Sequence, residues 1–285
     1  MTAGVGYGLL SLAAAGVLDV VFARYSGGRR VTWVYLAAMG ATLFAGQSLV
    51  LALSRVPVVF DITTALGGIV AGGVLMLANA LLIESLGRMN VSLGSTIYRL
   101  NTIAVVAFAV AFLSEALTWR KLSGVAFGVI AVMLLYRRGG REGDDRRLVT
   151  ALWIAISASL LRAAFGIFSK VGLTGGIDPF VFLVYVGAGW TLTAIAYGIV
   201  RGRSPVPVRE ILPYAILSGV LACFVASFLL LGLRTGEASI VIPIANMSFV
   251  VALLTSAALS MERLTRQKLL AVGSAALAIV LLVRA

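Results

Sequence analysis

Long uncharged stretches alternate with short charged ones along the chain, and this pattern predicts membrane-spanning helices. A helix needs about 20 apolar residues to cross the hydrocarbon core of a bilayer. Most stretches reach that length, three of them interrupted by one charge each, at Asp19, Arg99 or Arg162. Two shorter runs become long enough if Lys121 and Lys268 extend along the interface toward the headgroups. The predicted spans are residues 4–23, 31–54, 62–83, 91–114, 122–136, 149–169, 179–200, 211–233, 238–261 and 269–283. We therefore expect an all-α membrane protein with ten transmembrane helices.

A repeat divides these spans into two sets of five. The segment Glu115–Lys121 recurs 147 residues later as Glu262–Lys268, and each copy lies between a long and a short apolar run. Five spans per copy is an odd number, so the second copy enters the membrane from the opposite side. We predict two inverted five-helix repeats around a central cavity, over residues 1–137 and 149–285. Residues 138–148 form a charged linker between them.

The repeated segment itself predicts structural roles. Thr118 and Thr265 are placed to cap the two short spans by accepting bonds from backbone N–H groups. The two lysines are expected at the headgroups, and Glu115 and Glu262 in interfacial loops, where charge is inexpensive.

Composition narrows the function classes. Hydrophobic residues make up 61% of the chain and charged residues 12%, against about 25% charged in soluble domains, which excludes an ordinary globular protein. The net charge of +12 falls in short loops between spans, so it indicates no nucleic-acid partner, and the positive-inside rule places both termini outside the cytoplasm. Histidine is absent, the single cysteine is Cys223, and no Gly-x-Ser-x-Gly motif occurs. These facts disfavour an enzyme, a metal site and a cofactor.

Charges inside the predicted spans are the sharpest sign of a site. A charged side chain at the bilayer centre costs at least about 2.5–3.5 kcal/mol, so it normally faces a partner or a wet cavity. The repeat offset relates Arg99 to Asn246, which follows Pro243 in a span that this proline loosens. Helical spacing places four hydroxyl side chains on the face of Arg99: Ser92, Ser95, Thr96 and Thr102.

Two interpretations of the intramembrane charges remain open. Asp19 can neutralise an arginine and lock two helices together. Alternatively, an arginine binds a substrate carboxylate or phosphate while an acidic residue exchanges a proton. Neutral polar residues within spans can line a cavity, or they can bond one helix to another. The candidate substrate-binding residues are Arg99, Arg162, Asn246, Thr96, Ser95, Asn79 and Gln47, and the candidate proton carriers are Asp19 and Glu84.

Glycine-rich stretches predict close helix packing. They are Gly67-Gly68, Ala71-Gly72-Gly73 and the pair Gly124 and Gly128. A hinge at the glycines of the third span is the alternative.

The repeated Glu-x-Leu-Thr-x-x-Lys and the spans around it resemble the ten-helix drug/metabolite transporter (DMT) superfamily, specifically its EamA-type repeat. The resemblance covers nearly the whole chain. It implies two inverted five-helix bundles around a central cavity, and export or import of small metabolites, often coupled to protons. It also implies a multi-pass protein of the bacterial inner membrane, with membrane lipid as a partner and a homodimer as the candidate assembly. Two features depart from the family. Its members usually keep both termini in the cytoplasm, and Thr96 stands where the first repeat usually has a proline.

Together these observations predict a secondary active transporter of a small polar metabolite, anionic or zwitterionic, such as an amino acid or organic acid. Transport would proceed by alternating access, with proton coupling through Asp19 or Glu84. The alternatives are a lipid-carrier flippase and a broad drug-efflux protein of the same fold.

Overall fold

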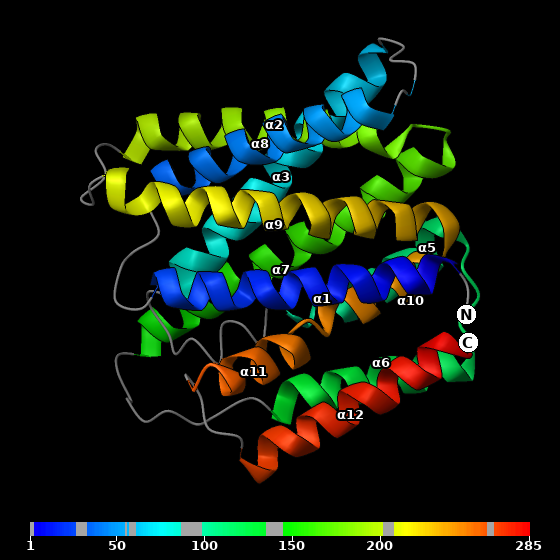
Figure 1. The fold of residues 1–285 in the computed structure, drawn as a ribbon. Helices are drawn as coiled ribbons and strands as arrows, with labels where there is room; N and C mark the ends of the chain where they lie inside the picture. Colours follow the sequence, from blue (N-terminus) through cyan, green and yellow to red (C-terminus); the bar gives the residue numbers. More distant parts are fainter. Residues whose placement is uncertain are drawn as a thin grey trace.

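The computed structural model describes residues 3–26, 33–54, 56, 61–86, 99–134, 145–201, 208–260 and 265–285, and in these ranges the chain forms helices and no strand. Most helices lie roughly along one common direction, and both termini lie at the same end of the bundle (Figure 1). The helices are α1 (Ala3–Ser26), α2 (Trp33–Ser54), α3 (Ile62–Leu86), α5 (Asn101–Leu113), α6 (Trp119–Leu134), α7 (Asp145–Thr174), α8 (Pro179–Arg201), α9 (Val208–Thr235), α10 (Ala238–Asn246), α11 (Phe249–Ala258) and α12 (Arg266–Val283).

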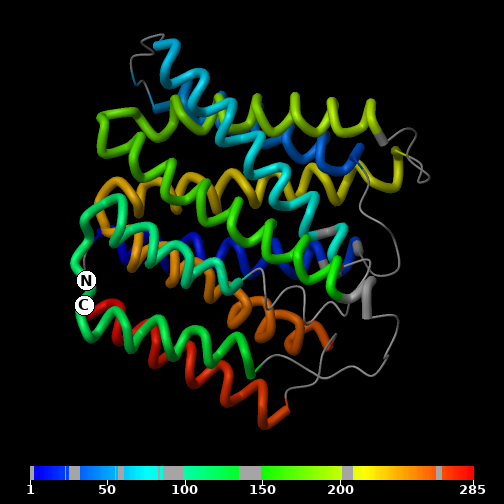
Figure 2. The backbone as a smooth tube through the Cα atoms, turned by 180° about the vertical axis from the view of Figure 1, so that it is seen from behind, coloured from blue at the N-terminus to red at the C-terminus, as the bar shows by residue number. Residues whose placement is uncertain are grey.

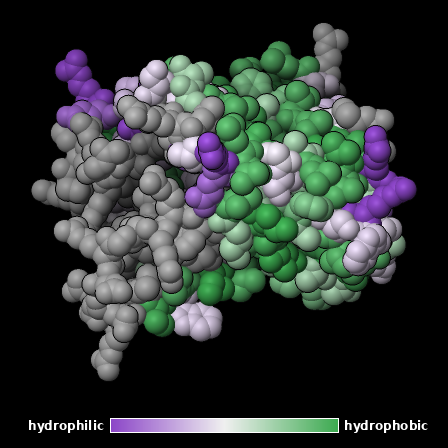
Figure 3. Space-filling view, turned by 90° about the horizontal axis from the view of Figure 1, so that it is seen from below, coloured by the Kyte–Doolittle hydropathy of each residue, from purple (hydrophilic) through white to green (hydrophobic). Residues whose placement is uncertain are grey.

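The described part of the chain contains eight segments long and apolar enough to cross a membrane, and α5 is a shorter apolar helix. The eight segments are Ala3–Phe22, Trp33–Ser54, Ile62–Leu82, Val149–Thr174, Pro179–Val200, Val208–Thr235, Ala238–Ala258 and Arg266–Val283. Many large apolar side chains on them are exposed, and hydrophobic residues cover much of the described surface in Figure 3. A surface of this kind suits lipid tails rather than water. The chain is therefore a multi-pass integral membrane protein.

The two halves of the chain interleave instead of forming separate lobes. From the second half, α8 packs on α2 and α3, α9 packs on α1 and α2, and α12 packs on α6; Figure 2 shows these segments alternating in space.

Individual contacts recur when the halves are exchanged by 147 residues. A Cβ on Gly72 would meet the main-chain oxygen of Val186 in α8, and a Cβ on Gly219 would meet that of Met39 in α2. Both members of the first pair lie 147 residues from the members of the second. The same close crossing thus occurs twice, between α3 and α8 and between α9 and α2.

Glycines allow these close crossings, as the sequence predicted. In α3, a Cβ on Gly68 would lie 2.4 Å from the Tyr185 side chain, and one on Gly72 would lie 2.0 Å from Val186 O. In α6, a Cβ on Gly124 would lie 2.7 Å from Leu282 of α12. The packing interpretation of these glycines is confirmed.

The predicted span 238–261 is broken into α10 and α11. Met247 and Ser248 form a turn between them, with bonds from Met247 N to Ile244 O and from Ser248 N to Ala245 O at 3.0 and 3.3 Å. Pro243 lies inside α10 and supplies no backbone donor. The main-chain oxygen of Asn246 accepts a bond from Arg99, so a side chain from the other half of the chain satisfies a group that a continuous helix would satisfy itself.

Other boundaries differ by a few residues. Helix α7 begins at Asp145, inside the predicted linker, and α6 and α12 begin at Trp119 and Arg266, before the predicted short spans. Thr118 and Thr265 cap these two helices as predicted, since their hydroxyls accept from Lys121 N and Lys268 N. The N-terminal part of the predicted span 91–114 lies outside the described residues.

The prediction that Lys121 reaches toward the headgroups is wrong. Its side chain is 2% exposed and donates to the Glu237 carboxylate and to Ala116 O. No local sequence pattern indicates this partner, because Glu237 lies at the junction of α9 and α10, in the other half of the chain. An anion and a carbonyl within reach bind the ammonium group more strongly than a distant interface does.

Glu115 also bonds across the halves. Its carboxylate accepts from Ala238 N, Ser239 N and the Ser239 hydroxyl at the first turn of α10. A carboxylate at a helix N-terminus satisfies free N–H groups and opposes the helix dipole. In its first copy the repeated motif therefore has a structural role, as expected, and that role is to join the first half of the chain to α10; Glu262 of the second copy lies outside the described residues.

Candidate functional site

The site is centred on Arg99, immediately before α5. Its guanidinium makes three hydrogen bonds: Nη2 to Asp19 Oδ2 of α1 at 2.5 Å, and Nη1 to Asn246 O and Ser248 Oγ at 2.9 Å each. The Arg99 Cζ also lies 5.6 Å from the centroid of the Phe249 ring, within the range of a cation–π contact. The arginine thus connects α1 with the α10–α11 junction.

The Arg99–Asp19 pair confirms that Asp19 neutralises one of the intramembrane arginines. The side chains are 18% and 32% exposed, so the pair is only partly removed from solvent. The Ser248 hydroxyl donates to Asp19 Oδ2 at 3.0 Å while it accepts from Arg99. One carboxylate oxygen therefore takes both bonds.

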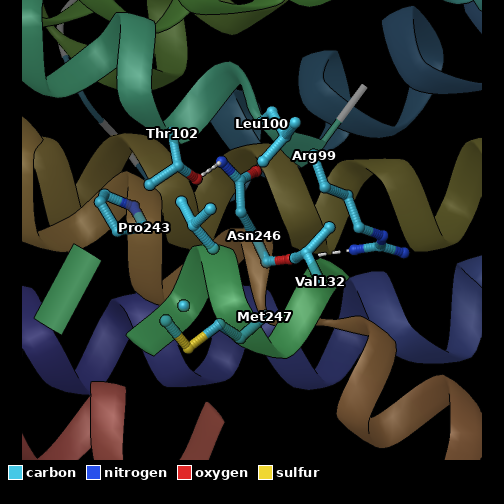
Figure 4. Close-up of a pocket in the computed structure, with 9 residues that line it drawn as sticks. Arg99, Leu100, Thr102, Val132, Pro243, Asn246 and Met247 are labelled. Carbon is cyan, nitrogen blue, oxygen red and sulfur yellow. Dashed lines mark hydrogen bonds between the residues drawn. The ribbon is translucent and has the colours of Figure 1, made fainter. Parts of the chain in front are cut away.

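A neutral polar cluster adjoins this pair. Asn246 Nδ2 donates to Asn101 Oδ1 at 2.6 Å and to Thr102 Oγ1 at 3.0 Å. Figure 4 shows the Asn246 amide pointing to Thr102 and its main-chain oxygen pointing the other way, to Arg99. Asn101 and Thr102 are buried, at 1% and 7% exposure. The two functional groups of Asn246 thus hold the charged and the neutral parts of the site together.

The break between α10 and α11 brings two helix ends, with the electric fields of their helix dipoles, to the Arg99–Asp19 pair. Helix α10 ends at Asn246, whose carbonyl accepts from Arg99, and α11 begins after Ser248, which donates to Asp19. A helix C-terminus favours a cation and an N-terminus favours an anion. The pair is therefore placed with the polarity that these ends stabilise, and an anionic ligand would find a favourable field at the start of α11.

A narrow pocket with room for about one water molecule lies beside this cluster. Arg99, Thr102 and Asn246 supply its polar lining. Its other walls are Leu100, Gly128, Val129, Val132, Pro243 and Met247, from the start of α5, from α6 and from α10. The pocket therefore combines a few polar groups with apolar walls, which is typical of small-molecule sites.

Of the predicted substrate-binding residues, the structure brings Arg99 and Asn246 together. Gln47 is buried between α2 and α9, where Nε2 donates to Cys223 O and Ser227 Oγ. Asn79 donates to Leu75 O within α3. Their contacts are those of helix packing, and neither lines the pocket around Arg99.

The remaining candidates lie away from this pocket or outside the described residues. Arg162 and Glu84 are half-buried on α7 and α3, and neither lines the pocket beside Arg99. Ser95 and Thr96, with Ser92, lie outside the described residues.

Three residues of the cluster were not singled out from the sequence: Asn101, Ser248 and Phe249. The repeat offset could have found two of them, Asn101 and Ser248. Ser248 lies 147 residues after Asn101, so each lies two positions after one of the aligned residues Arg99 and Asn246. Polar residues at both +2 positions were the available signal.

A second group of charges lies at the end of the bundle where α1 begins. Lys170 of α7 donates to Leu233 O and Gly236 O, at 2.6 and 2.7 Å, beside Glu115 and Glu237 in an open pocket. Lys170 thus binds the C-terminal carbonyls of α9, as Glu115 binds the N-terminus of α10. These bonds fix the junction of the two helices.

Comparison with known proteins agrees with this arrangement. Residues 149–284 match the EamA-like transporter family. This half of the chain is an EamA-like transporter domain. No curated protein matches the chain. A solved structure titled "Crystal structure of protein" is similar to it, with a TM-score of 0.82 and 16% sequence identity over 98% of this chain and 99% of the other.

The structural likeness extends the fold, though not the function, to the first half of the chain. The EamA-like domain contains Asn246 and Ser248, and the first half supplies Arg99 and Asp19. The site thus needs both halves.

Proposed function

We propose that this EamA-like protein is a secondary active transporter of a small anionic or zwitterionic metabolite of the amino-acid or organic-acid class. The observation that carries the proposal is the Arg99 guanidinium, partly exposed beside a pocket inside the membrane and held by Asp19, Ser248 and Asn246 O. A carboxylate can accept two parallel bonds from a guanidinium, so a substrate can take the place of Asp19.

Displacement of Asp19 would couple transport to protons. A carboxylate released from its arginine inside a membrane is costly while charged, and it becomes neutral by binding a proton. Asp19 is 32% exposed and so accessible for this exchange. An anionic substrate would then move together with one proton.

We also propose that the two halves are inverted repeats that rock about the Arg99–Asn246 contact in alternating access. Two observations support the inversion. The Gly72–Val186 and Gly219–Met39 contacts are interchanged by the 147-residue offset. In Figure 1, α1 runs away from the end that holds the termini, whereas α7, the first helix of the second half, runs toward it. We place the protein in the bacterial plasma membrane.

The experiment is uptake into proteoliposomes of a labelled panel: glutamate, malate, leucine and the cation putrescine. We expect uptake of an anion or zwitterion by the wild type, at least a tenfold loss in Arg99→Gln, and near-normal uptake in Arg234→Gln, which removes an exposed arginine. Asp19→Asn should abolish the stimulation of uptake by an inward proton gradient. Unchanged uptake in Arg99→Gln, or uptake of putrescine alone, would refute the proposal.

A further inference from the structure

Contacts between the two halves of the chain close the end of the bundle that holds the termini, here named the terminal end (Figure 2). There α1 begins against the α9–α10 junction, where a Cβ on Gly4 would lie 2.8 Å from Gly236 Cα. At the same end, the Glu115 carboxylate accepts from Ala238 N and Ser239 N at 2.7 and 3.0 Å. The first half is therefore fastened to the start of α10.

Two helices connect the terminal end with the site around Arg99. Helix α5 begins just after Arg99 and ends at Leu113, close to Glu115. Helix α10 begins at Ala238, beside Glu115, and ends at Asn246. The two helices pack against each other, and the 13 residues of α5 cover about 20 Å. If α5 and α10 part at the terminal end, the gap leads toward the site.

An ion pair joins the two halves at this point. Lys121 of α6 donates to the carboxylate of Glu237, the residue before α10. The lysine side chain is 2% exposed and the glutamate side chain 47%. The open pocket at this end is lined by Glu115 and Glu237, whereas Lys121 does not line it. Water therefore reaches the anion from the terminal end, and the cation lies buried behind it.

Separation of the halves would take the anion away from Lys121. A buried ammonium that loses its anion keeps the cost of desolvation without the attraction that offset it. Lys121 also donates to Ala116 O, which belongs to the same half and moves with the lysine. Opening at the terminal end would thus leave the ammonium beside a neutral partner, and the closed state is favoured.

The two repeats differ at the anion of this pair. The 147-residue offset relates Glu237 to Asn90. It relates Glu115, the neighbouring acid, to a second glutamate, Glu262. The chain therefore repeats the acid that caps α10, but it does not repeat the carboxylate that Lys121 binds. A contact built into one of two related repeats adds its free energy to one state of the protein and not equally to the other.

We infer that Lys121 and Glu237 form a latch, which holds the terminal end closed and biases the protein toward a resting state closed at that end. This inference rests on the proposed function, because alternating access requires the halves to part at this end. The latch residues touch no substrate. They set the equilibrium between two states, and that equilibrium shifts by the free energy that a contact contributes to one state alone.

The experiment measures how fast a buried reporter thiol reacts with a water-soluble maleimide in the purified full-length protein. The reporter is Ala109→Cys in a Cys223→Ser background, which removes the single native cysteine. Ala109 of α5 is fully buried, in one core cluster with Val241 and Ile242 of α10. A buried thiol reacts through the open state, so the labelling rate follows the population of that state.

The test variant is Glu237→Asn, which installs the residue that the other repeat has at this position. We expect it to raise the labelling rate at position 109 by at least about tenfold, and Glu237→Asp, which keeps the charge, to lie between it and the parent. Adding Lys121→Met to Glu237→Asn should bring no further increase, because the pair acts as a unit. Glu237→Gln serves where Glu237→Asn shows no cooperative melting.

Two controls separate the latch from general loosening. Arg234→Gln breaks an ion pair with Asp178 at the same end but within the second half, so it should change the labelling rate at position 109 by less than about twofold. The second control moves the reporter to Ala194→Cys, a fully buried position of α8 in a different core cluster. Labelling there should be unaffected by Glu237→Asn.

An unchanged labelling rate at position 109 in Glu237→Asn, or equal increases at positions 109 and 194, would overturn the latch. Either result leaves uptake by the wild type, and with it the proposed function, as it was. If the wild type takes up no anion or zwitterion of the panel, the proposed function fails whatever the labelling rates are, and the latch fails with it as a step of transport.

Discussion

Replacing Gly72 by alanine tests how closely α3 and α8 cross. The added Cβ would lie 2.0 Å from Val186 O and 2.8 Å from Trp190 N. Both are backbone atoms of α8, so no side-chain rotation relieves the clash, and a carbon normally stays about 3.3 Å or more from a carbonyl oxygen. The helices must separate by about 1 Å. Overpacking of this kind costs about 1–3 kcal/mol and sometimes more, and the helix preference of alanine returns about 1 kcal/mol at most.

The matched control is Gly67→Ala, one and a half turns earlier in α3. There the added Cβ would lie 3.6 Å from the Phe168 ring, which is an ordinary contact, so this variant keeps the propensity gain without the clash. The propensity gain is the same in both variants, so we expect Gly72→Ala to be about 1–3 kcal/mol less stable than Gly67→Ala. Thermal unfolding in detergent should show a melting temperature lower by roughly 2–8 °C. Equal melting temperatures would refute the close crossing and return the hinge interpretation of these glycines.

Three further predictions concern the charged groups. Glu115→Ala removes the acceptor for three bonds at the start of α10 and should lower the free energy of unfolding by about 2–4 kcal/mol. The stability of Glu115→Gln should lie between that of Glu115→Ala and that of the wild type. A loss below about 0.5 kcal/mol in denaturant titration of Glu115→Ala would count against the cap. Arg99→Gln and Asp19→Asn should not be additive: a double-mutant cycle should give a coupling of about 1–3 kcal/mol, whereas additive losses would mean that the pair contributes nothing. Asp61 lies before α3, where bonds from Thr64 and its backbone N–H lower the pKa of the carboxyl. Its cap is therefore complete at neutral pH and is lost as pH falls through that lowered pKa, so the difference in melting temperature between wild type and Asp61→Leu should shrink below about pH 4; a constant difference from pH 7 to pH 3 would contradict it.

The hydrophobic pattern predicted most helices because a bilayer leaves few alternatives. Every backbone polar group in the hydrocarbon must be satisfied within its own segment or by the protein, so length and absence of charge are enough to find a span. The same pattern could not show the break at Met247 and Ser248. That break depends on Arg99 donating to Asn246 O, a contact between residues 147 positions apart.

Charged residues were harder to interpret than apolar ones, since their partners lie far away in sequence. The sequence left two interpretations of Asp19 open, one of them that it neutralises an arginine, and the structure pairs it with Arg99. For Lys121, the local sequence favours the nearby interface over a partner elsewhere in the chain. Its actual partner, Glu237, belongs to a helix junction that no local pattern connects with it.

The repeat also explains why the site is chemically one-sided. Arg99 bonds directly to the main chain of its counterpart, Asn246. Two arginines at these positions would bring like charges together, at a cost of about 4 kcal/mol for 4 Å in a partly shielded protein environment. Asp19 can neutralise only one of them. Where two copies of a unit meet, one copy must therefore give up its charge. The neutral residue that replaces it turns a contact between equivalent positions into a site with a charged end and an uncharged end, which fixes the direction in which an asymmetric substrate lies.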